Sequence, residues 1–268
     1  MQYYNDNKLY KFLRNSYKFK FSPINVWELI YGDRNSNPKL LVLVAGIHKS
    51  DINKGLSYIL NKGSYARLNY LSKQSGLPFI CIAFEVDVEM IDKVYFVEQG
   101  GEFRNLTLNE LKERFQTYGL PIKNSLTQKY LNDRTSSAYH KWQRNNLGNE
   151  ITVSDIDLWI VDLKYNIPIA ILEIKRSKIP LNFWKPFKDD YPNFKLISNL
   201  CNISNIKFKI VYYHMKKYMK EHTKDRPENI SRIKVFSVNV KKGQLIISSG
   251  KIISLSDFII SEGWVIDE

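Results

Sequence analysis

The sequence predicts an α/β protein in which a mixed central sheet flanked by helices is built twice. Short apolar runs, typical of strands, alternate with longer segments of helical periodicity. The order of these segments in the first half of the chain returns in the second half. Apolar residues make up 44% of the 268 residues, which is ample material for one large core or two of ordinary size.

The first half begins with a helical pattern and continues with strand-like runs such as FICIAF, which contains Cys81. We expect helices near residues 6–16, 52–75 and 107–116, and strands near 24–32, 39–47, 78–86 and 93–98. The turn-prone segment YGLPIKNS then separates this half from the next.

The second half repeats that order. We expect helices near residues 126–147 and 183–201, strands near 154–163, 168–175, 206–213 and 232–240, and a final strand or turn near 244–254. The charged segment at residues 216–226 is expected to be a loop.

Residue identities support a duplication. Arg14-Asn15 aligns with Arg144-Asn145 at an offset of 130, and after a shorter second hairpin turn AGIHKS aligns with LEIKRS at an offset of 127. The offset changes only where surface loops are expected. The sequence therefore predicts two domains, residues 1–122 and 123–268.

Residues 154–177 combine acidic and basic side chains with two apolar strands joined by the turn sequence LKYNIP. In a hairpin symmetric about Tyr165, Asp157 lies opposite Glu173 and Asp155 lies opposite Lys175. Because side chains alternate along a strand, these four share one face. The opposite face carries apolar residues only, namely Ile156, Leu158, Ile160, Ala170, Leu172 and Ile174.

An aspartate at the start of one strand and a Glu-x-Lys near the end of the next resemble the PD-(D/E)XK nuclease superfamily, to which many restriction endonucleases belong. The matching residues are Asp157 and the triplet Glu173-Ile174-Lys175, and the segment SSAYHKWQRNN lies where that fold has its first core helix. The proline that precedes the aspartate in the family is missing; Ser154-Asp155 lies there, and Asp155 competes with Asp157 for the role.

The resemblance implies a restriction-endonuclease-like core and a Mg²⁺-dependent DNA endonuclease, with Mn²⁺ able to substitute. Asp157, Glu173 and the Ile174 carbonyl would bind the metal ion. Lys175 would orient or deprotonate the attacking water, or neutralise the scissile phosphate. Asp155 would bind a second metal or pair with Lys175. In the aligned first half, Trp27, Gly46 and His48 replace Asp157, Glu173 and Lys175, so that domain would be degenerate.

The formal charge of +13 favours a polyanionic partner, with nucleic acid first and an anionic membrane surface second, and the resemblance makes that nucleic acid DNA. Candidate nucleic-acid contacts are Arg176 and Lys178, in a segment that mixes basic and aromatic residues, and His140 and Arg144, one helical turn apart. Core aromatics with solvated lysines remain the alternative. Two such domains suggest a homodimer or an intramolecular pseudo-dimer.

The sequence does not support a membrane protein, a disulfide-bonded protein or a metal site built from cysteine or histidine. No apolar run is long enough to span a bilayer, the two cysteines have no disulfide or metal spacing, and the four histidines form no cluster. We therefore expect a cytoplasmic protein without a membrane partner. Two alternatives to a DNA endonuclease remain open, namely an inactive nucleic-acid-binding protein and an RNase or single-strand nuclease on the same fold.

Overall fold

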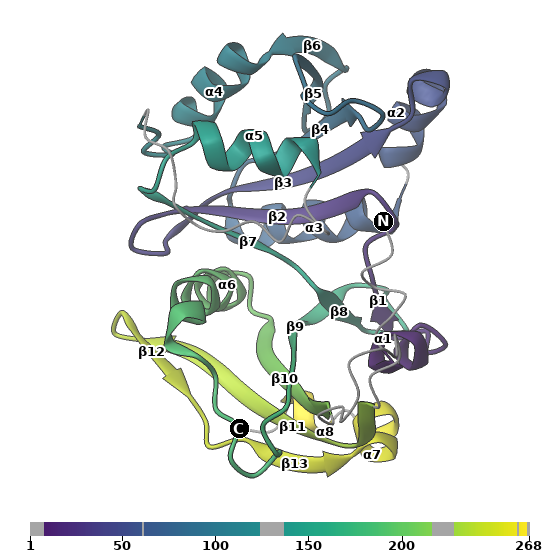
Figure 1. The fold of residues 1–268 in the computed structure, drawn as a ribbon, viewed down its shortest axis with the longest axis vertical. Coiled ribbons are helices and arrows are strands. Elements are labelled where there is room, and N and C mark those ends of the chain that lie inside the picture. Colours follow the sequence, from purple (N-terminus) through teal and green to yellow (C-terminus); the bar gives the residue numbers. More distant parts are fainter. Residues whose placement is uncertain (1–7, 61, 124–136, 216–227, 262, 267–268) are drawn as a thin grey trace, which may run out of the picture. The chain divides into compact units, whose positions relative to one another are not determined.

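The computed structural model describes residues 8–60, 62–123, 137–215, 228–261 and 263–266. These residues form a mixed α/β protein with two mixed sheets and several helices, which confirms the predicted α/β class (Figure 1). The chain divides into two compact units. The first is Ser22–Ile156, and the second joins Gln2–Phe21 to Asp157–Glu268. No helix in the described ranges has the length and apolar character needed to cross a membrane.

The first unit contains a sheet of six strands in the order β6-β5-β4-β3-β2-β7 (Figure 1). In chain order its elements are β2 (Val26–Asp33), β3 (Pro38–Ile47), α2 (Ile52–Leu60), α3 (Gly63–Ser75), β4 (Phe79–Glu85), β5 (Lys93–Glu98), β6 (Arg104–Thr107), α4 (Leu108–Thr117), α5 (Ala138–Asn146) and β7 (Ile151–Asp155), with a 3₁₀ turn at Lys49–Asp51. Only β3 and β4 are parallel.

Local sequence explains several of these boundaries. The strand β4 is the predicted FICIAF run, and its apolar residues are buried because β4 lies between β3 and β5, with the apolar cluster on one face and α3 against the sheet. Helix α4 begins with a capping box, in which Thr107 and Glu110 each accept a hydrogen bond from the other's backbone N–H. Helices α4 and α5 cover one face of this sheet, where Phe115, Tyr139 and Trp142 join the apolar cluster.

The second unit contains seven strands in the order β1-β8-β9-β10-β11-β12, with β13 also paired to β11. Its elements are α1 (Lys8–Leu13), β1 (Phe19–Lys20), β8 (Leu158–Val161), β9 (Pro168–Ser177), α6 (Tyr191–Ile203), β10 (Lys207–Met215), β11 (Glu228–Lys241), β12 (Gln244–Ile247), β13 (Lys251–Ser254), α7 (Leu255–Ile260) and α8 (Gly263–Ile266), with a 3₁₀ turn at Lys188–Asp190. Helix α6 covers one face, and α1, α7 and α8 contribute to the apolar cluster on the other (Figure 1).

The two sheets share one plan of pairing. From β7 to β6 and from β1 to β12, neighbouring strands are antiparallel, antiparallel, parallel, antiparallel and antiparallel. In each sheet, however, one edge strand and the helix before it come from the other half of the sequence. The pair α1–β1 belongs to the second unit, and the pair α5–β7 belongs to the first.

This exchange changes two sequence-based expectations. The boundary expected between residues 122 and 123 differs from the observed division, because α5 and β7 pack into the first unit. The single strand expected at residues 154–163 is wrong, since β7 ends at Asp155 in the first sheet and β8 begins at Leu158 in the second. The predicted loop at 216–226 and the start of the helix predicted at 126–147 lie outside the described residues.

Two predicted helices are also shorter than expected. The segment at 52–75 forms two helices, α2 and α3, instead of one. The helix expected from residue 183 begins at Tyr191, because Trp184 is buried against the sheet and holds residues 178–187 as a loop. Pro186 in this loop also removes a backbone donor that a helix needs.

A buried ion pair links β2 to α3 in the first unit. The Arg67 Nη2 atom lies 2.6 Å from Glu28 Oε1, and Ser22 Oγ donates to the same carboxylate at 3.0 Å. Both charged side chains are almost fully buried. Removing one partner leaves an uncompensated charge in a low-dielectric interior.

We therefore expect Glu28→Gln to lower the free energy of unfolding of the first unit by about 3–5 kcal/mol. Urea unfolding, followed by hydrogen exchange at the amides of β3 and β4, measures this loss. The double variant Glu28→Met/Arg67→Met, which removes both charges, should recover most of it. A loss below about 1 kcal/mol in the single variant would contradict the prediction.

Candidate active site

The β8–β9 hairpin has the predicted register. Leu158 pairs with Leu172, Trp159 with Ile171 and Ile160 with Ala170, which is the pairing symmetric about Tyr165. The turn is stabilised by Asp162, whose Oδ1 accepts hydrogen bonds from two backbone N–H groups at 2.8 Å. The hairpin therefore brings the residue before β8, Asp157, to the level of Glu173.

Asp157 is fixed against β9 by a hydrogen bond. The Ile174 N–H donates to its Oδ2 at 3.0 Å. Leu158, Leu172 and the partly buried Ile174 belong to the apolar cluster of one sheet face. Since side chains alternate along a strand, Glu173 and Lys175 project to the other face, where α6 lies.

Glu173 and Lys175 form a partly buried ionic cluster with a third residue, Asp190. The Lys175 Nζ atom lies 2.9 Å from Glu173 Oε1 and 3.4 Å from Asp190 Oδ2. Its side chain is 27% exposed and that of Glu173 is 15% exposed, so water screens the cluster only in part. The ammonium also lies 5.5 Å from the centre of the Phe194 ring.

Sequence reasoning missed Asp190. It occupies the N-cap position of α6, but its side chain makes no capping hydrogen bond and reaches Lys175 instead. The pair Asp189-Asp190 before Tyr-Pro is a recognisable helix-start signal. That signal would have placed the start of the helix correctly, although it does not indicate a contact with Lys175.

The neighbouring carboxylates hold Lys175 in its charged form. Burial lowers the pKa of Lys175, but Glu173, Asp190 and Asp157 together raise it by more, and the net pKa lies above the usual value. The side chain is thus an ammonium at neutral pH. It suits the binding of a phosphate or the orientation of a water molecule better than proton abstraction.

Asp155 does not join this cluster as predicted. It is the last residue of β7 and pairs with Leu29 in the first sheet, so it has no cross-strand position opposite Lys175. The cause is the change of sheet at Ile156, whose N–H donates to the Glu28 carbonyl at 2.9 Å. Asp155 and Asp157 therefore belong to different units.

His140 and Arg144 also belong to the first unit, on α5. The His140 Nδ1 atom lies 2.7 Å from Oγ of Ser137, the N-cap residue, and its ring packs edge-on against Trp27 at 5.1 Å. These are the contacts of a packing and capping histidine. Burial lowers the pKa of His140, while Asp155 raises it and Arg144 lowers it, and the net shift is downward.

This shift gives a pH dependence with a definite sign. Because the folded state disfavours protonated His140, the unfolded state binds the proton more readily, and stability is lost as pH falls below about 6.5. We expect the unfolding free energy of the first unit to fall between pH 7.5 and 5.0, and to fall less in His140→Gln. Urea titrations of both proteins at the two pH values measure the difference. Equal pH dependences would contradict it.

The basic and aromatic segment after β9 is a loop with a buried anchor. The Trp184 ring stacks on Tyr212 with centroids 4.1 Å apart and planes 1° apart, and is itself buried. Phe183 and Phe187, by contrast, are 75% and 50% exposed. The sequence left open whether these aromatics belong to the core or lie exposed for contact with nucleic acid. In the structure one of them belongs to the core and two face solvent.

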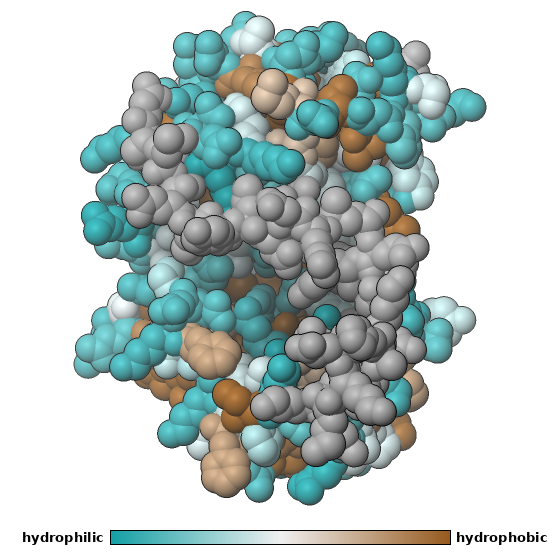
Figure 2. Space-filling view, viewed as in Figure 1, coloured by the Kyte–Doolittle hydropathy of each residue, from teal (hydrophilic) through white to brown (hydrophobic). Residues whose placement is uncertain are grey.

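The predicted contacts Arg176 and Lys178 lie at the start of this loop. Arg176 pairs with Tyr213 near the end of β9, and Lys178 is exposed just beyond it. The coloured residues on the face drawn in Figure 2 are mostly hydrophilic, with apolar side chains exposed singly or in small groups. Two exposed phenylalanines within five residues are thus a local concentration of apolar surface among lysines.

The oxygen donors here match the preference of a hard divalent cation in type, and they supply two carboxylates. Two carboxylates, Asp157 and Glu173, and the Ile174 carbonyl offer oxygen ligands, and Mg²⁺ commonly binds through one or two carboxylates plus a substrate phosphate. Nowhere in the described residues do three or more His, Cys, Asp or Glu side chains form a group that could hold a metal ion. No family model, curated protein or solved structure matches this chain.

Proposed function

We propose that the chain is a Mg²⁺-dependent endonuclease that hydrolyses DNA phosphodiester bonds, with its active site in the second unit. The observation that carries this proposal is the β8–β9 register, which aligns Asp157 with Glu173 and leaves Lys175 on the same face. The net charge of +13 adds support, since it favours a polyanionic substrate.

The order of elements around these residues supports the resemblance to the PD-(D/E)XK superfamily. Strands β8 and β9 are antiparallel, and α6 then leads to β10, which is parallel to β9. In this proposal α1 and β1 complete the core, in place of the predicted segment around His140, because β1 pairs with β8 and α1 joins the same apolar cluster. The proposal therefore assigns residues from both ends of the chain to one catalytic core.

In the proposed mechanism, Asp157, Glu173 and the Ile174 carbonyl would hold the metal ion. A bound Mg²⁺ supplies electrostatic stabilisation of the charge that develops on the phosphate and lowers the pKa of a bound water. The Lys175 ammonium contacts the scissile phosphate or orients the water, because its acidic neighbours keep it protonated. Asp190 positions this ammonium from the start of α6.

The first unit is proposed to be a degenerate partner without an active site. The residues of β3 that alternate away from the apolar cluster of Val42 and Val44 are Leu41, Leu43, Ala45 and Ile47, and all are apolar and buried. This face of β3 therefore has no carboxylate that could correspond to Glu173, however the two halves of the sequence are aligned. The residue alignment expected from the sequence does not hold, since Trp27 pairs with Val44 and not with Gly46.

One specific observation favours an alternative, an inactive protein that binds nucleic acid. Lys175 already has carboxylate partners in Glu173 and Asp190, and Asp155, the extra acid expected in the site, belongs to the other unit. Such a protein would bind DNA or RNA in a salt-dependent manner without hydrolysing it.

Incubation with supercoiled plasmid in Mg²⁺ and in EDTA separates these functions. A single active site should nick the plasmid in Mg²⁺ or Mn²⁺ and leave it intact in EDTA. Parallel reactions with single-stranded DNA and with RNA identify the substrate class. Binding to all of these without metal-dependent cleavage would reject the enzyme and support the alternative.

A further inference from the structure

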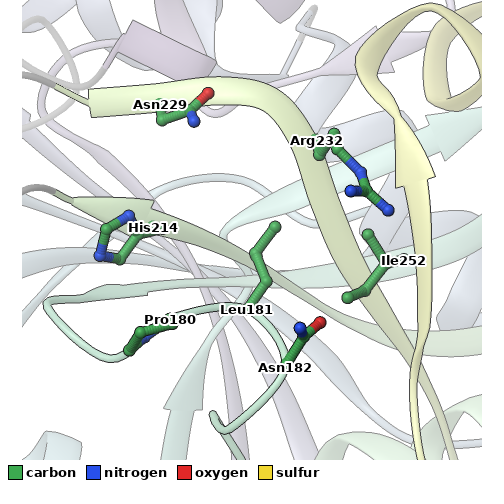
Figure 3. A pocket seen from close by; sticks show the side chains of 7 residues that line it. All are labelled: Pro180, Leu181, Asn182, His214, Asn229, Arg232 and Ile252. Carbon is green, nitrogen blue, oxygen red and sulfur yellow. The ribbon is translucent and has the colours of Figure 1, made fainter.

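A cavity of about 200 Å³ lies in the second unit beside the loop that follows β9. Its lining comes from the loop, from β10, from β11 and from β13, as Figure 3 shows. The lining residues are Pro180, Leu181, Asn182, His214, Asn229, Arg232 and Ile252.

The cavity lies on the sheet face that carries Glu173 and Lys175. The β9–β10 register pairs Lys175 with Tyr212 and Ser177 with His214. Since side chains alternate, His214 projects on the same face as Lys175, one step further along the strands. Arg232 on β11 shares this face, because the next residue, Ile233, belongs to the apolar cluster on the other face.

The lining suits an anionic group attached to a flat or apolar body. Arg232 supplies a permanent positive charge with a planar fork of donors, and His214 and the two asparagine amides add further donors. Pro180, Leu181 and Ile252 supply apolar walls. No carboxylate lines the cavity within the part of the chain that the structure describes. One nucleotide combines a phosphate with a sugar and a base in this way.

The loop that forms one wall is held firmly in place. Trp184 stacks on Tyr212, the Lys234 ammonium donates to the Trp184 carbonyl at 3.2 Å, and the Tyr212 hydroxyl donates to the Ser177 carbonyl at 3.1 Å. These contacts fix the loop at its centre and at its start. Phe183 and Phe187, which flank this anchor, are exposed together with Lys185.

We propose that this cavity binds one nucleotide of an unpaired DNA strand, with the phosphate on Arg232 and His214, while Phe183 and Phe187 stack on neighbouring bases. This inference rests on the proposed function and names its substrate class. An exposed aromatic ring stacks on a base only where the base face is free, as in single strands, and Lys185, between the two rings, suits contact with the backbone. A duplex offers such faces only at its ends.

The test measures binding in EDTA, so that it does not depend on cleavage. A fluorescently labelled thymidine 15-mer and a blunt duplex of mixed sequence are titrated with the full chain by anisotropy, at several salt concentrations. We expect tighter binding of the single strand. We expect Arg232→Met to weaken it about tenfold and to reduce the dependence of log K on log salt by about one unit. The double variant Phe183→Ser/Phe187→Ser should weaken it by about tenfold or more.

Matched variants outside the cavity control for general effects. Lys207→Met removes an exposed charge from β10, and Tyr17→Ser removes an exposed aromatic ring of the second unit. Both should bind like the unmodified chain. Equal affinity of Arg232→Met and the unmodified chain, or tighter binding of the duplex, would overturn the proposal. If the chain binds as expected but never cleaves DNA, only the proposed enzyme fails, because the two assays are separate.

Discussion

Replacing Glu173 with glutamine is expected to reduce Mg²⁺-dependent cleavage at least about a hundredfold while leaving the fold intact. The substitution removes one of the two carboxylates proposed to hold the metal ion, and metal stabilisation of a transition state is worth several kcal/mol. The side chain keeps its shape, and Lys175 keeps Asp190 as a partner at 3.4 Å. Initial rates of plasmid nicking at saturating Mg²⁺, with thermal unfolding measured alongside, test both parts of this expectation.

Matched variants make the result specific. Asp189→Asn is the same acid-to-amide change at an exposed residue next to Asp190, and it should cleave at the rate of the unmodified chain. Lys175→Met should lose activity and Lys188→Met, at an exposed lysine, should keep it. If Glu173→Gln and Lys175→Met both cleave normally in Mg²⁺, the cluster on the α6 face is not the active site and the nuclease proposal fails.

Removing residues 1–21 is expected to unfold the second unit and to leave the first unit folded. The deletion takes away α1 and β1, and with them Leu9, Leu13 and Phe19, which are buried in the core of the second unit. Truncation of one buried leucine to alanine costs about 2–5 kcal/mol, and a domain is stable by only about 5–15 kcal/mol. The edge strand opposite β8 is lost as well.

Hydrogen exchange of the truncated chain is the direct measurement. Amides of β9 and β10 should lose their protection, whereas amides of β3 and β4 should keep it. A milder pair of variants covers the case of aggregation. Leu13→Ala should destabilise the second unit by about 2–5 kcal/mol, and Phe12→Ala, at the exposed neighbouring residue, by less than about 0.5 kcal/mol. Protection of β9 in the truncated chain would show that α1 and β1 are dispensable.

The register of the central hairpin was predictable from sequence because its determinants are local. The turn around Asn166, which adopts a positive φ of 53°, fixes the pairing, and the alternation of Leu158, Ile160 and Leu172 fixes the buried face. The relation of Asp157 to Glu173 followed from these two facts alone.

The position of Asp155 was not predictable in the same way. The run at residues 154–163 reads as one strand, because nothing in an alternating pattern marks the residue at which a chain leaves one sheet and enters another. That change depends on which edges are available, and the edge partner of β7 is β2, more than a hundred residues away. The pairing of Lys175 with Asp190 was missed for a related reason, since it depends on the loop held by Trp184.

The exchange of α1–β1 and α5–β7 has a consequence for synthesis of the chain. When the ribosome has made only the first half of the chain, the edge of β2 is still unpaired, because its partner strand ends at Asp155. The N-terminal helix and β1 also lack their partners, which follow them by some 150 residues. An open strand edge is a template for pairing with other chains, and distant pairing is slow. The gene therefore cannot be divided at its midpoint into two products that each fold alone. Neighbouring nascent chains on one messenger RNA are therefore candidates for domain swapping of these segments.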